Sequence, residues 1–397
     1  MLNEVKLAPG VYFVGAVDWA IRDFHGYTTP RGVTYNSYLI VDEKICLIDT
    51  VKAPFVNELL ERISQIVPLD KIDYVITNHV EPDHSSGLPA VMAKAPQAKV
   101  VLTGQGQAGI TKYYQQNYDF MVVKEGDSLD LGRNKLQFIP LPMLHWPDSM
   151  ATYLTGEEIL FSNDAFGQHI CTTKRFDDEN DLDEVLYEAA KYYANILMPF
   201  GKLVVKALGK CGALPIKMIA PSHGVVWRGH IPRILEKYQL WGQGGLTNKV
   251  VIAYDSMWGS TEIMARRILD GVAAAGVTGK LHRNATSDRS EVIWDILEAG
   301  GVLVGCSTQN NGVLATTGAL LTQLKGLRPA NKLAAGFGAF GWGGGAQAAI
   351  EEALAAAGMV VEKPGVTLKW TADPAELEQC FQFGLAFGRK VKEKVGG

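Results

Sequence analysis

The segment His79-Val80-Glu81-Pro82-Asp83-His84 holds four potential metal ligands in six positions, directly after the strand-like run 73–77. Pro82 prevents the segment from continuing as a regular helix or a central strand, so we expect a loop at a strand end. In an extended segment, residues 79, 81 and 83 point to one side, while His84 turns toward a second ion. Burying four such groups is costly unless a cation compensates them. The segment therefore predicts a two-metal site.

Three further candidate ligands, His145, Asp164 and His223, follow apolar runs later in the chain. Taken alone, each histidine is better interpreted as an ordinary polar residue with its hydrogen bonds satisfied. Together with segment 79–84, the three fit a sheet scaffold that gathers ligands from the ends of several strands into a rigid site.

Length and charge narrow the class of protein. At 397 residues the chain exceeds the usual size of one hydrophobic core, so we expect two domains. The formal net charge of −4 argues against a general nucleic-acid binder. No apolar run reaches the ~18–20 residues that span a bilayer, and the start, Met1–Glu4, lacks the features of a secretory signal. We expect a cytoplasmic protein that binds neither nucleic acid nor membrane.

The five cysteines are widely spaced and form no Cys-x-x-Cys pair; they are Cys46, Cys171, Cys211, Cys306 and Cys380. This spacing argues against a disulfide framework and against an iron–sulfur or rubredoxin-type site in the chain. Any iron would have to be held by histidine and carboxylate groups.

A glycine-rich stretch at 241–249 separates two regions with different patterns. Before it, helical segments at 55–66 and 181–196 interrupt strand-like runs at 11–15, 36–41, 45–49, 73–77, 98–102, 136–141, 152–154 and 158–161. After it, strands alternate with helices: 250–254 with 260–275, 301–305 with 314–324, and 332–336 with 345–357. Such alternation is typical of a doubly wound parallel sheet. We predict an α/β protein with domains at 1–249 and 250–397.

Three loops after strands of the second half are rich in hydroxyls, amides and glycines. The first opens a helix, whose free amides and nearby hydroxyls form an anion site without lysine. No Gly-Lys-Ser/Thr follows, which excludes a Walker loop. The loop resembles the flavodoxin phosphate loop Ser-x-Thr-Gly-x-Thr, with tryptophan in place of the middle threonine. In a flavodoxin-like sheet three such strand ends converge on FMN; the predicted FMN residues are Ser256, Met257, Trp258, Gly259, Ser260, Thr261, Ser307, Thr308, Gln309, Asn310, Asn311, Ala339, Phe340, Gly341, Trp342, Gly343 and Gly344.

A competing pattern, Gly-x-Gly-x-x-Gly, occurs at 336–341 and would indicate a dinucleotide site, with Glu362 about 20 residues later. That interpretation leaves the loops at 256–261 and 307–311 without a role. FMN uses all three loops, and Phe340 and Trp342 would pack against the flavin ring.

The ligand set resembles that of the metallo-β-lactamase-like fold, whose zinc hydrolases carry His-x-His-x-Asp-His. This chain departs from the pattern at Glu81, where the hydrolases have histidine. The exchange replaces a neutral imidazole by a harder, anionic oxygen ligand, which shifts the preference from zinc toward iron or manganese. Glu81, Asp83 and Asp164 would also nearly neutralise two divalent ions.

The variant His-x-Glu-x-Asp-His, followed by a flavodoxin-like domain, resembles the flavodiiron protein family over nearly the whole chain. The resemblance implies a metallo-β-lactamase-like αββα sandwich with two non-haem irons and an oxo or hydroxo bridge, and FMN in the second domain. It implies one iron at His79, Glu81 and His145, and a second at Asp83, His84 and His223, with Asp164 bridging. Family members reduce dioxygen to water or nitric oxide to nitrous oxide.

The resemblance also implies partners. Family members form head-to-tail homodimers or dimers of dimers, which place the FMN of one subunit beside the metals of the other. Without a rubredoxin module, electrons would come from an external donor such as rubredoxin, a flavin reductase or reduced coenzyme F420. His25 and Tyr193 are candidates to hydrogen-bond a bound gas, with core or surface roles as the alternative. Two alternative hypotheses place the chain in other classes of protein. One is a two-zinc hydrolase with an appended flavodoxin module, and the other is an electron carrier that has lost its metals.

Overall fold

The computed structural model describes residues 5–396, so the start Met1–Glu4 and Gly397 lie outside the described residues. Contacts divide the chain into two compact units. Unit 1 holds the chain up to Tyr192 and Lys202–Gln239, and unit 2 holds Tyr193–Gly201 and the chain from Leu240 on. The short segment 193–201 joins unit 2 although it precedes the glycine-rich stretch, because Tyr193 packs against Trp241 with 5.1 Å between ring centroids.

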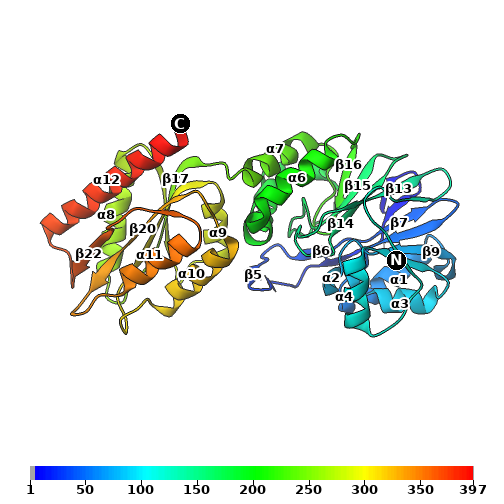
Figure 1. Cartoon of the computed structure of the whole chain (residues 1–397), viewed down its shortest axis with the longest axis horizontal. Helices are drawn as coiled ribbons and strands as arrows, with labels where there is room; N and C mark the ends of the chain where they lie inside the picture. Colours follow the sequence, from blue (N-terminus) through cyan, green and yellow to red (C-terminus); the bar gives the residue numbers. More distant parts are fainter. Residues whose placement is uncertain (1–4, 397) are drawn as a thin grey trace. The chain divides into compact units, whose positions relative to one another are not determined.

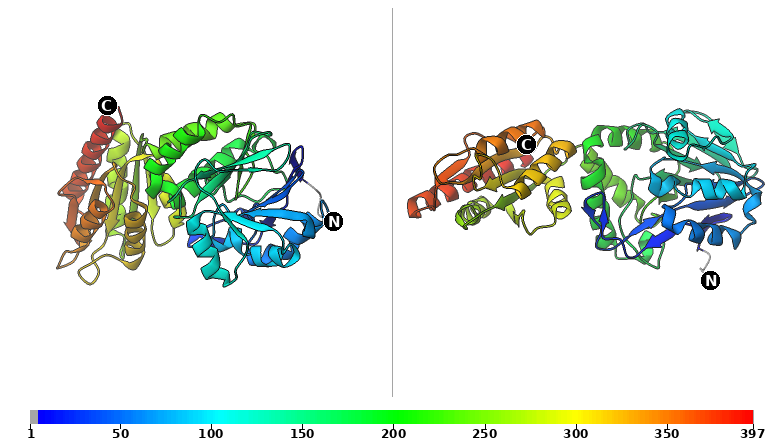
Figure 2. Two further views of the ribbon diagram at one scale, coloured as in Figure 1. Left: turned by 45° about the vertical axis from the view of Figure 1, so that its right-hand side comes forward. Right: turned by 90° about the horizontal axis from the view of Figure 1, so that it is seen from below.

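Within residues 5–396, unit 1 is built on two large sheets (Figures 1 and 2). The first runs in the order β1-β2-β7-β8-β9-β10-β11, antiparallel up to β8 and parallel beyond it. Its strands are β1 (Val5–Ala8), β2 (Val11–Phe13), β7 (Tyr38–Val41), β8 (Ile45–Ile48), β9 (Ile72–Ile76), β10 (Lys99–Leu102) and β11 (Phe120–Val122). The second is antiparallel except for its last pair: β12 (Ser128–Asp130), β13 (Lys135–Pro140), β14 (Met150–Leu154), β15 (Ile159–Asn163) and β16 (Met218–Pro221).

Helices and short ribbons complete unit 1. Two small ribbons pair β3 (Ala16–Asp18) with β6 (Val33–Tyr35) and β4 (Asp23–Phe24) with β5 (Tyr27–Thr28). The helices are α1 (Val56–Ser64), α2 (Pro82–Ser85), α3 (Leu88–Lys94), α4 (Gly104–Tyr114), α5 (Leu182–Tyr192), α6 (Gly201–Cys211) and α7 (Ile231–Gly242). Single turns of unit 1 lie at Ala53–Phe55, Leu69–Lys71 and Asp177–Glu179, whereas the turns at Tyr193–Leu197 and Met198–Phe200 belong to unit 2.

The core of unit 1 follows from the period of two along its strands. On β8, Ile48 faces a core shared by both sheets, where it joins Phe161 of β15. Its neighbour Leu47 faces the opposite side, where Leu59 of α1 and Val91 of α3 cover the first sheet. The layers are therefore helix, sheet, sheet and helix, as expected for an αββα sandwich.

Unit 2 is a parallel sheet in the order β18-β17-β19-β20-β21, with β22 also beside β20. The strands are β17 (Thr247–Asp255), β18 (Thr278–Arg283), β19 (Ala299–Cys306), β20 (Leu333–Phe340), β21 (Val360–Val361) and β22 (Val366–Lys369). The helices are α8 (Ser260–Ala274), α9 (Arg289–Leu297), α10 (Ala315–Leu327), α11 (Ala346–Ala356) and α12 (Pro374–Gly396). The strand order, 2-1-3-4-5 in sequence order, is that of a doubly wound, flavodoxin-like fold, and α8 and α12 share a core on one face of the sheet (Figure 1).

The expectation of a loop over residues 79–84 is wrong at its second half, where Pro82–Ser85 form helix α2. Proline is tolerated at the first position of a helix because its missing N–H would have no partner there. Because Asp83 and His84 lie in this helix, the extended alternation of 79, 81 and 83 does not hold.

Among residues 5–396, no helix combines the length and the apolar character needed to cross a membrane.

Candidate functional site

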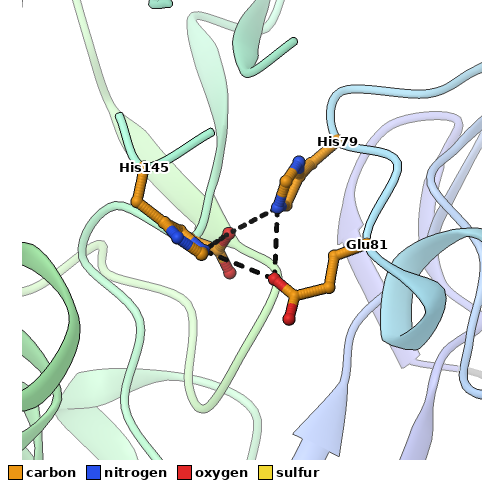
Figure 3. A group of neighbouring side chains, drawn as sticks. His79, Glu81 and His145 are labelled. Carbon is orange, nitrogen blue, oxygen red and sulfur yellow. Dashed lines mark hydrogen bonds and ion pairs between the residues drawn. The ribbon is translucent and has the colours of Figure 1, made fainter. Parts of the chain in front are cut away.

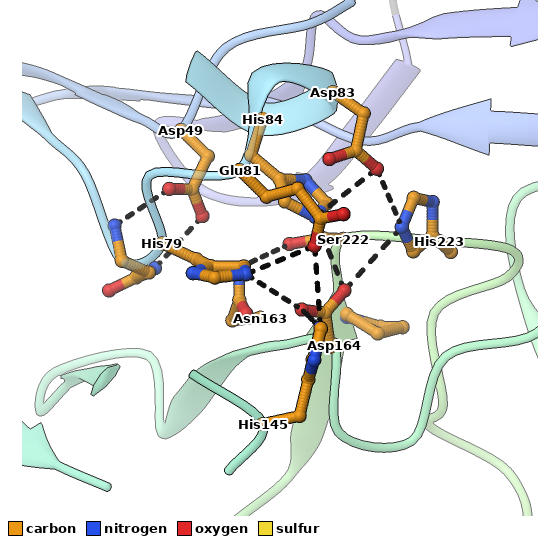
Figure 4. A network of polar contacts seen from close by, with 12 residues as sticks. Asp49, His79, Glu81, Asp83, His84, His145, Asn163, Asp164, Ser222 and His223 are labelled. Carbon is orange, nitrogen blue, oxygen red and sulfur yellow. Dashed lines mark hydrogen bonds and ion pairs between the residues drawn. The ribbon is translucent and has the colours of Figure 1, made fainter. Parts of the chain in front are cut away.

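The seven predicted metal ligands converge at one edge of unit 1, where the strands that carry them end. His79 follows β9, His145 follows β13, Asp164 follows β15 and His223 follows β16. The structure collects the seven into two neighbouring groups whose ligand atoms lie within 4.8 Å of one another: His79, Glu81, His145 and Asp164 in the first, and Asp83, His84 and His223 in the second. Figure 4 shows both groups facing each other across Asp164.

The first group surrounds one point in space. The Nε2 atoms of His79 and His145 lie 3.2 and 3.4 Å from the same oxygen, Oε2 of Glu81. Figure 3 shows the two imidazoles and this carboxylate pointing toward one another. Oδ2 of Asp164 lies 3.3 Å from His145 Nε2 and 3.8 Å from His79 Nε2. Two imidazole nitrogens and two carboxylate oxygens therefore face a common centre.

The second group repeats this arrangement with the other oxygen of Asp164. Oδ2 of Asp83 lies 3.3 Å from His223 Nε2 and 3.4 Å from His84 Nε2. Oδ1 of Asp164 lies 3.2 Å from His84 Nε2 and 3.5 Å from His223 Nε2. Asp164 thus offers one oxygen to each group, which is the geometry of a carboxylate that bridges two ions.

The electrostatics of the cluster favour ionised carboxylates. Burial would raise the pKa of Asp164, but His84, His145 and His223 hold that pKa well below its usual range. Burial likewise opposes a charge on His145, yet the neighbouring carboxylates of Asp164 and Glu81 raise its pKa to about 9. The pKa of His223 rises to about 10 against its burial, because Asp164 and Asp83 lie beside it. Divalent ions binding here would replace the protons of the imidazoles.

Buried polar atoms without hydrogen-bond partners also indicate that the cluster binds divalent ions. Oδ1 of Asp83, Oδ2 of Asp164 and Nδ1 of His84 are buried, and none of them has a hydrogen-bond partner among the described residues. Buried carboxylate oxygens without partners are rare and call for a specific cause. Ligation of metal would satisfy the two oxygens, so the donor set fits two divalent ions.

Two supporting contacts orient the imidazoles. Nδ1 of His79 donates to Oδ2 of Asp148 at 3.0 Å, and the same oxygen accepts the backbone N–H of Val80 at 2.8 Å. Nδ1 of His223 donates to the carbonyl of Thr34 at 2.6 Å. Both contacts leave Nε2 to face the cluster, as is usual for histidines that bind metal. Asp148 was not predicted from the sequence; its only signal is an acidic side chain three residues after His145.

His25 lies at the tip of the β4–β5 ribbon. Its φ of 57° and that of Gly26, 79°, fit the two-residue turn of a tight hairpin. Nε2 of His25 is 3.4 Å from Oε1 of Glu81, and the side chain is 73% exposed. His25 therefore borders the first group from the solvent side.

Tyr193, the other residue predicted beside the gas, packs its ring against Trp241 in unit 2. The neighbouring Tyr192 reaches the cluster, and its hydroxyl donates to Oδ1 of Asp164 at 2.9 Å. Successive side chains of a helix diverge by about 100°, so only one of two adjacent tyrosines can face the cluster.

In unit 2, a cavity of about 750 Å³ lies where strands β17, β19 and β20 end. Of the predicted FMN residues, Met257, Trp258, Ser260, Ser307, Thr308, Asn310, Asn311, Ala339, Phe340, Gly341, Trp342 and Gly343 line it. The cavity has the size of a cofactor pocket, and the N-terminus of α8 beside it fits a phosphate. The residues present therefore fit FMN.

The other predicted FMN residues do not line this cavity. Ser256 accepts the N–H of Gly259 at 3.0 Å, and the buried Thr261 shares a hydrogen bond of 2.9 Å with Ser307, so both brace the loop. Gln309 pairs with Gly312 through the backbone, and Gly344 lines a separate cavity. Trp370 and Thr371, which the sequence did not single out, do line the FMN cavity because β22 ends at the same edge of the sheet.

The dinucleotide pattern at 336–341 lacks the structure it requires. Residues 336–340 lie inside strand β20 rather than in a turn between strand and helix. A Cβ at Gly338 would lie 2.0 Å from the carbonyl oxygen of Cys306, so this glycine allows two strands to approach closely.

Comparisons with known proteins agree with this geometry. Residues 33–224 match the family described as ODP family beta lactamase, and residues 252–384 match the flavodoxin family. The chain is 47% identical to the nitric oxide reductase of Moorella thermoacetica over 99% of this chain and 100% of that protein. It is 38% identical to the flavodiiron protein from Giardia intestinalis (TM-score 0.97, 100% and 98% covered) and 38% identical to the rubredoxin oxygen:oxidoreductase of Desulfovibrio gigas (TM-score 0.97, both chains fully covered).

The orientation of His79 by Asp148 is testable. Asp148→Ala removes the acceptor for Nδ1, and we expect metal affinity to fall about 10- to 100-fold, measured as metal retained against graded chelator. Asp148→Asn keeps an acceptor oxygen and should recover most of the affinity. Asp295→Ala, which removes a carboxylate paired with His282 in unit 2, is the matched control and should retain the metal. Equal retention by Asp148→Ala and the wild type would contradict the assigned role.

Proposed function

The chain belongs to the flavodiiron protein family, and we propose that it is an oxidoreductase that reduces nitric oxide or dioxygen at a non-haem diiron site, with electrons relayed through FMN. The full-length matches to the nitric oxide reductase of Moorella thermoacetica and to flavodiiron structures support this function. The observation that carries it is the division of the Asp164 carboxylate between two histidine–carboxylate groups. The predicted family, fold class and general activity are confirmed by these matches.

Glu81 favours iron over zinc in the first group. Its Oε2 contacts both His79 and His145, so an anionic oxygen occupies a ligand position that is an imidazole in the zinc hydrolases. Carboxylate-rich sites suit iron better than zinc. The comparisons do not favour the alternative of a two-zinc hydrolase, since the relatives of known activity named above are reductases.

We propose His79, Glu81 and His145 as ligands of one iron, Asp83, His84 and His223 as ligands of the other, and Asp164 as the bridge. When bound, the irons and FMN supply the electron transfer to the gas. The chain's own residues hold these groups in place: Asp148 and Thr34 fix the two imidazoles, and Tyr192 donates to Asp164. His25 is the exposed residue beside Glu81 from which a hydrogen bond to a bound gas would come.

For FMN, we propose that the phosphate binds at the first turn of α8 beside Ser260, with Ser307 and Thr308 nearby. Phe340 and Trp342 would flank the flavin ring. We keep the proposed domains, 1–249 for the metals and 250–397 for FMN, which the matches at 33–224 and 252–384 support. The five cysteines are free thiols, a state that a reducing compartment maintains, so we propose a cytoplasmic location.

We further propose an external electron donor, such as rubredoxin or a flavin reductase, and a head-to-tail homodimer. Support for a partner comes from the rim of the FMN cavity, where Trp258 and Trp342 are 93% and 94% exposed and Trp370 is 66% exposed. Exposed aromatic residues gathered around one cavity are typical of an interaction surface.

Metal analysis, flavin analysis and two gas assays test the function together. We expect two irons and one FMN per chain, and loss of nitric oxide or dioxygen when the protein receives electrons from reduced rubredoxin. Anaerobic and aerobic assays on the same preparation identify the preferred gas. Two zincs per chain, or no consumption of either gas by iron-loaded protein, would refute the proposal.

The role of Glu81 predicts a change of metal. Glu81→His restores the zinc-hydrolase pattern. We expect the zinc-to-iron ratio of protein purified from cells supplied with both metals to rise by tenfold or more, which corresponds to about 1.4 kcal/mol in relative affinity. Glu81→Asp keeps the charge and serves as the control that should still prefer iron. Unchanged iron occupancy and activity in Glu81→His would show that the carboxylate does not select the metal.

The exposed tryptophans predict the state of assembly. Sedimentation of the wild type should show a dimer or a dimer of dimers, and the double variant Trp258→Ser/Trp342→Ser should shift the equilibrium toward the monomer because it removes apolar area from the rim. Trp19→Ser, at a 55% exposed tryptophan of unit 1, is the control and should leave the state of assembly unchanged. A monomeric wild type would rule out the homodimer.

A further inference from the structure

A second cavity, of about 540 Å³, lies in unit 1 on the outer face of the second sheet. Leu160 of β15 lines it from the sheet, Leu208 of α6 and Leu235 of α7 line it from the helices. Figure 1 shows α6 and α7 on this side of β14–β16. The sheet residues belong to a small apolar cluster of their own, separate from the core between the sheets.

The wall of this cavity holds no buried polar group that lacks a partner among the described residues. The hydroxyl of Ser162 donates to the carbonyl of Ala165 at 2.7 Å, and the hydroxyl of Tyr238 accepts the N–H of Phe166 at 2.6 Å. Burial raises the pKa of the Cys211 thiol, which stays neutral. The charged residue among those that line the cavity, Glu236, is 71% exposed in its side chain. The chemistry of the buried part of the wall therefore suits a small apolar ligand.

Several residues that line the cavity are sequence neighbours of proposed metal ligands. Leu144, which lines it, immediately precedes His145, and Ala165 and Phe166, which also line it, immediately follow Asp164. All three lining residues are more than 90% buried. Two elements that carry proposed iron ligands therefore form part of the cavity wall.

We propose that this cavity binds and stores the apolar diatomic substrate, nitric oxide or dioxygen, beside the metal site. The inference rests on the proposed function, which supplies a substrate of the right size and polarity. The cavity opens to solvent beside the half-buried Leu208 and Leu235, and apolar walls in proteins take up small apolar ligands, xenon among them. Apolar gases leave water for such surroundings, because the transfer of apolar surface out of water is favourable. A volume of about 540 Å³ holds several diatomic molecules next to the backbone of His145 and Asp164.

Xenon is the probe for occupancy. Crystals of the iron-loaded, FMN-loaded protein are pressurised with xenon, and we expect xenon density among Leu160, Leu208 and Leu235. Ala207→Trp places an indole in the cavity from α6 and should remove that density. Ala213→Trp, at an exposed position just after α6 that does not line the cavity, should leave it unchanged.

Steady-state kinetics tests the storage role. In Ala207→Trp we expect the KM for the gas to rise about three- to tenfold while kcat at saturating gas stays the same, because the bulky side chain removes gas binding that precedes the chemistry. Leu208→Phe, a smaller change that is easier to accommodate, should raise KM in the same direction. Iron content, FMN content and the thermal midpoint of each variant identify any loss that comes from misfolding.

The outcomes separate this inference from the function on which it rests. A wild-type cavity without xenon overturns the inference, and so does an unchanged KM in a variant that has lost the xenon site. A long-chain apolar molecule bound there and seen by native mass spectrometry also overturns it. A protein that reduces neither gas refutes the proposed function and the storage role, whereas the xenon data still show whether the cavity takes up an apolar gas.

Discussion

The structure of unit 1 depends on the position of one carboxylate. Asp164 contacts His145 through Oδ2 and His84 through Oδ1, so its two oxygens join the two ligand groups. It is 2% exposed, and a charge buried so deeply is tolerated only with opposite charges close by. The fold must therefore deliver imidazoles to both sides of a single side chain within a few ångströms. An αββα sandwich does so because strands of both its sheets end at one edge.

The chain reaches this geometry through a break in the regular alternation of β15. Asn163, the last residue of the strand, has a φ of 56°, a conformation that asparagine tolerates better than most residues. Its carbonyl accepts the N–H of Ser222 at 2.8 Å, and its side-chain amide donates to the Ser222 hydroxyl at 3.2 Å (Figure 4). These bonds tie the end of β15 to the end of β16. The residues that follow, Asp164 and His223, are thereby held side by side.

Sequence patterns predicted most of these strands and helices, and the features that they did not predict have physical causes. Every strand and helix predicted on either side of the glycine-rich stretch is present, because apolar periodicity reports the buried face of an element. The helix at Pro82 was missed because proline breaks helices inside but starts them at the first turn. The sequence could not show which of the adjacent Tyr192 and Tyr193 faces the metal cluster, because that depends on how helix α5 is rotated about its axis. Asp148 and Trp370 act through contacts distant in the sequence, which no local pattern encodes.

The side chains of strand β15 and the residue after it serve three purposes: they fill the core, line the apolar cavity and supply the bridging carboxylate. Phe161 faces the core between the sheets and stabilises the sandwich, whereas Leu160 and Ser162 face the opposite side and line the apolar cavity. The turn at Asn163 then releases Asp164 from the sheet and directs it to the metal cluster. Since the ligand and the cavity wall share one short strand, a substitution that shifts β15 to suit the cavity would also move the bridging carboxylate. Packing on the outer face of the second sheet is therefore constrained by the geometry of the metal site.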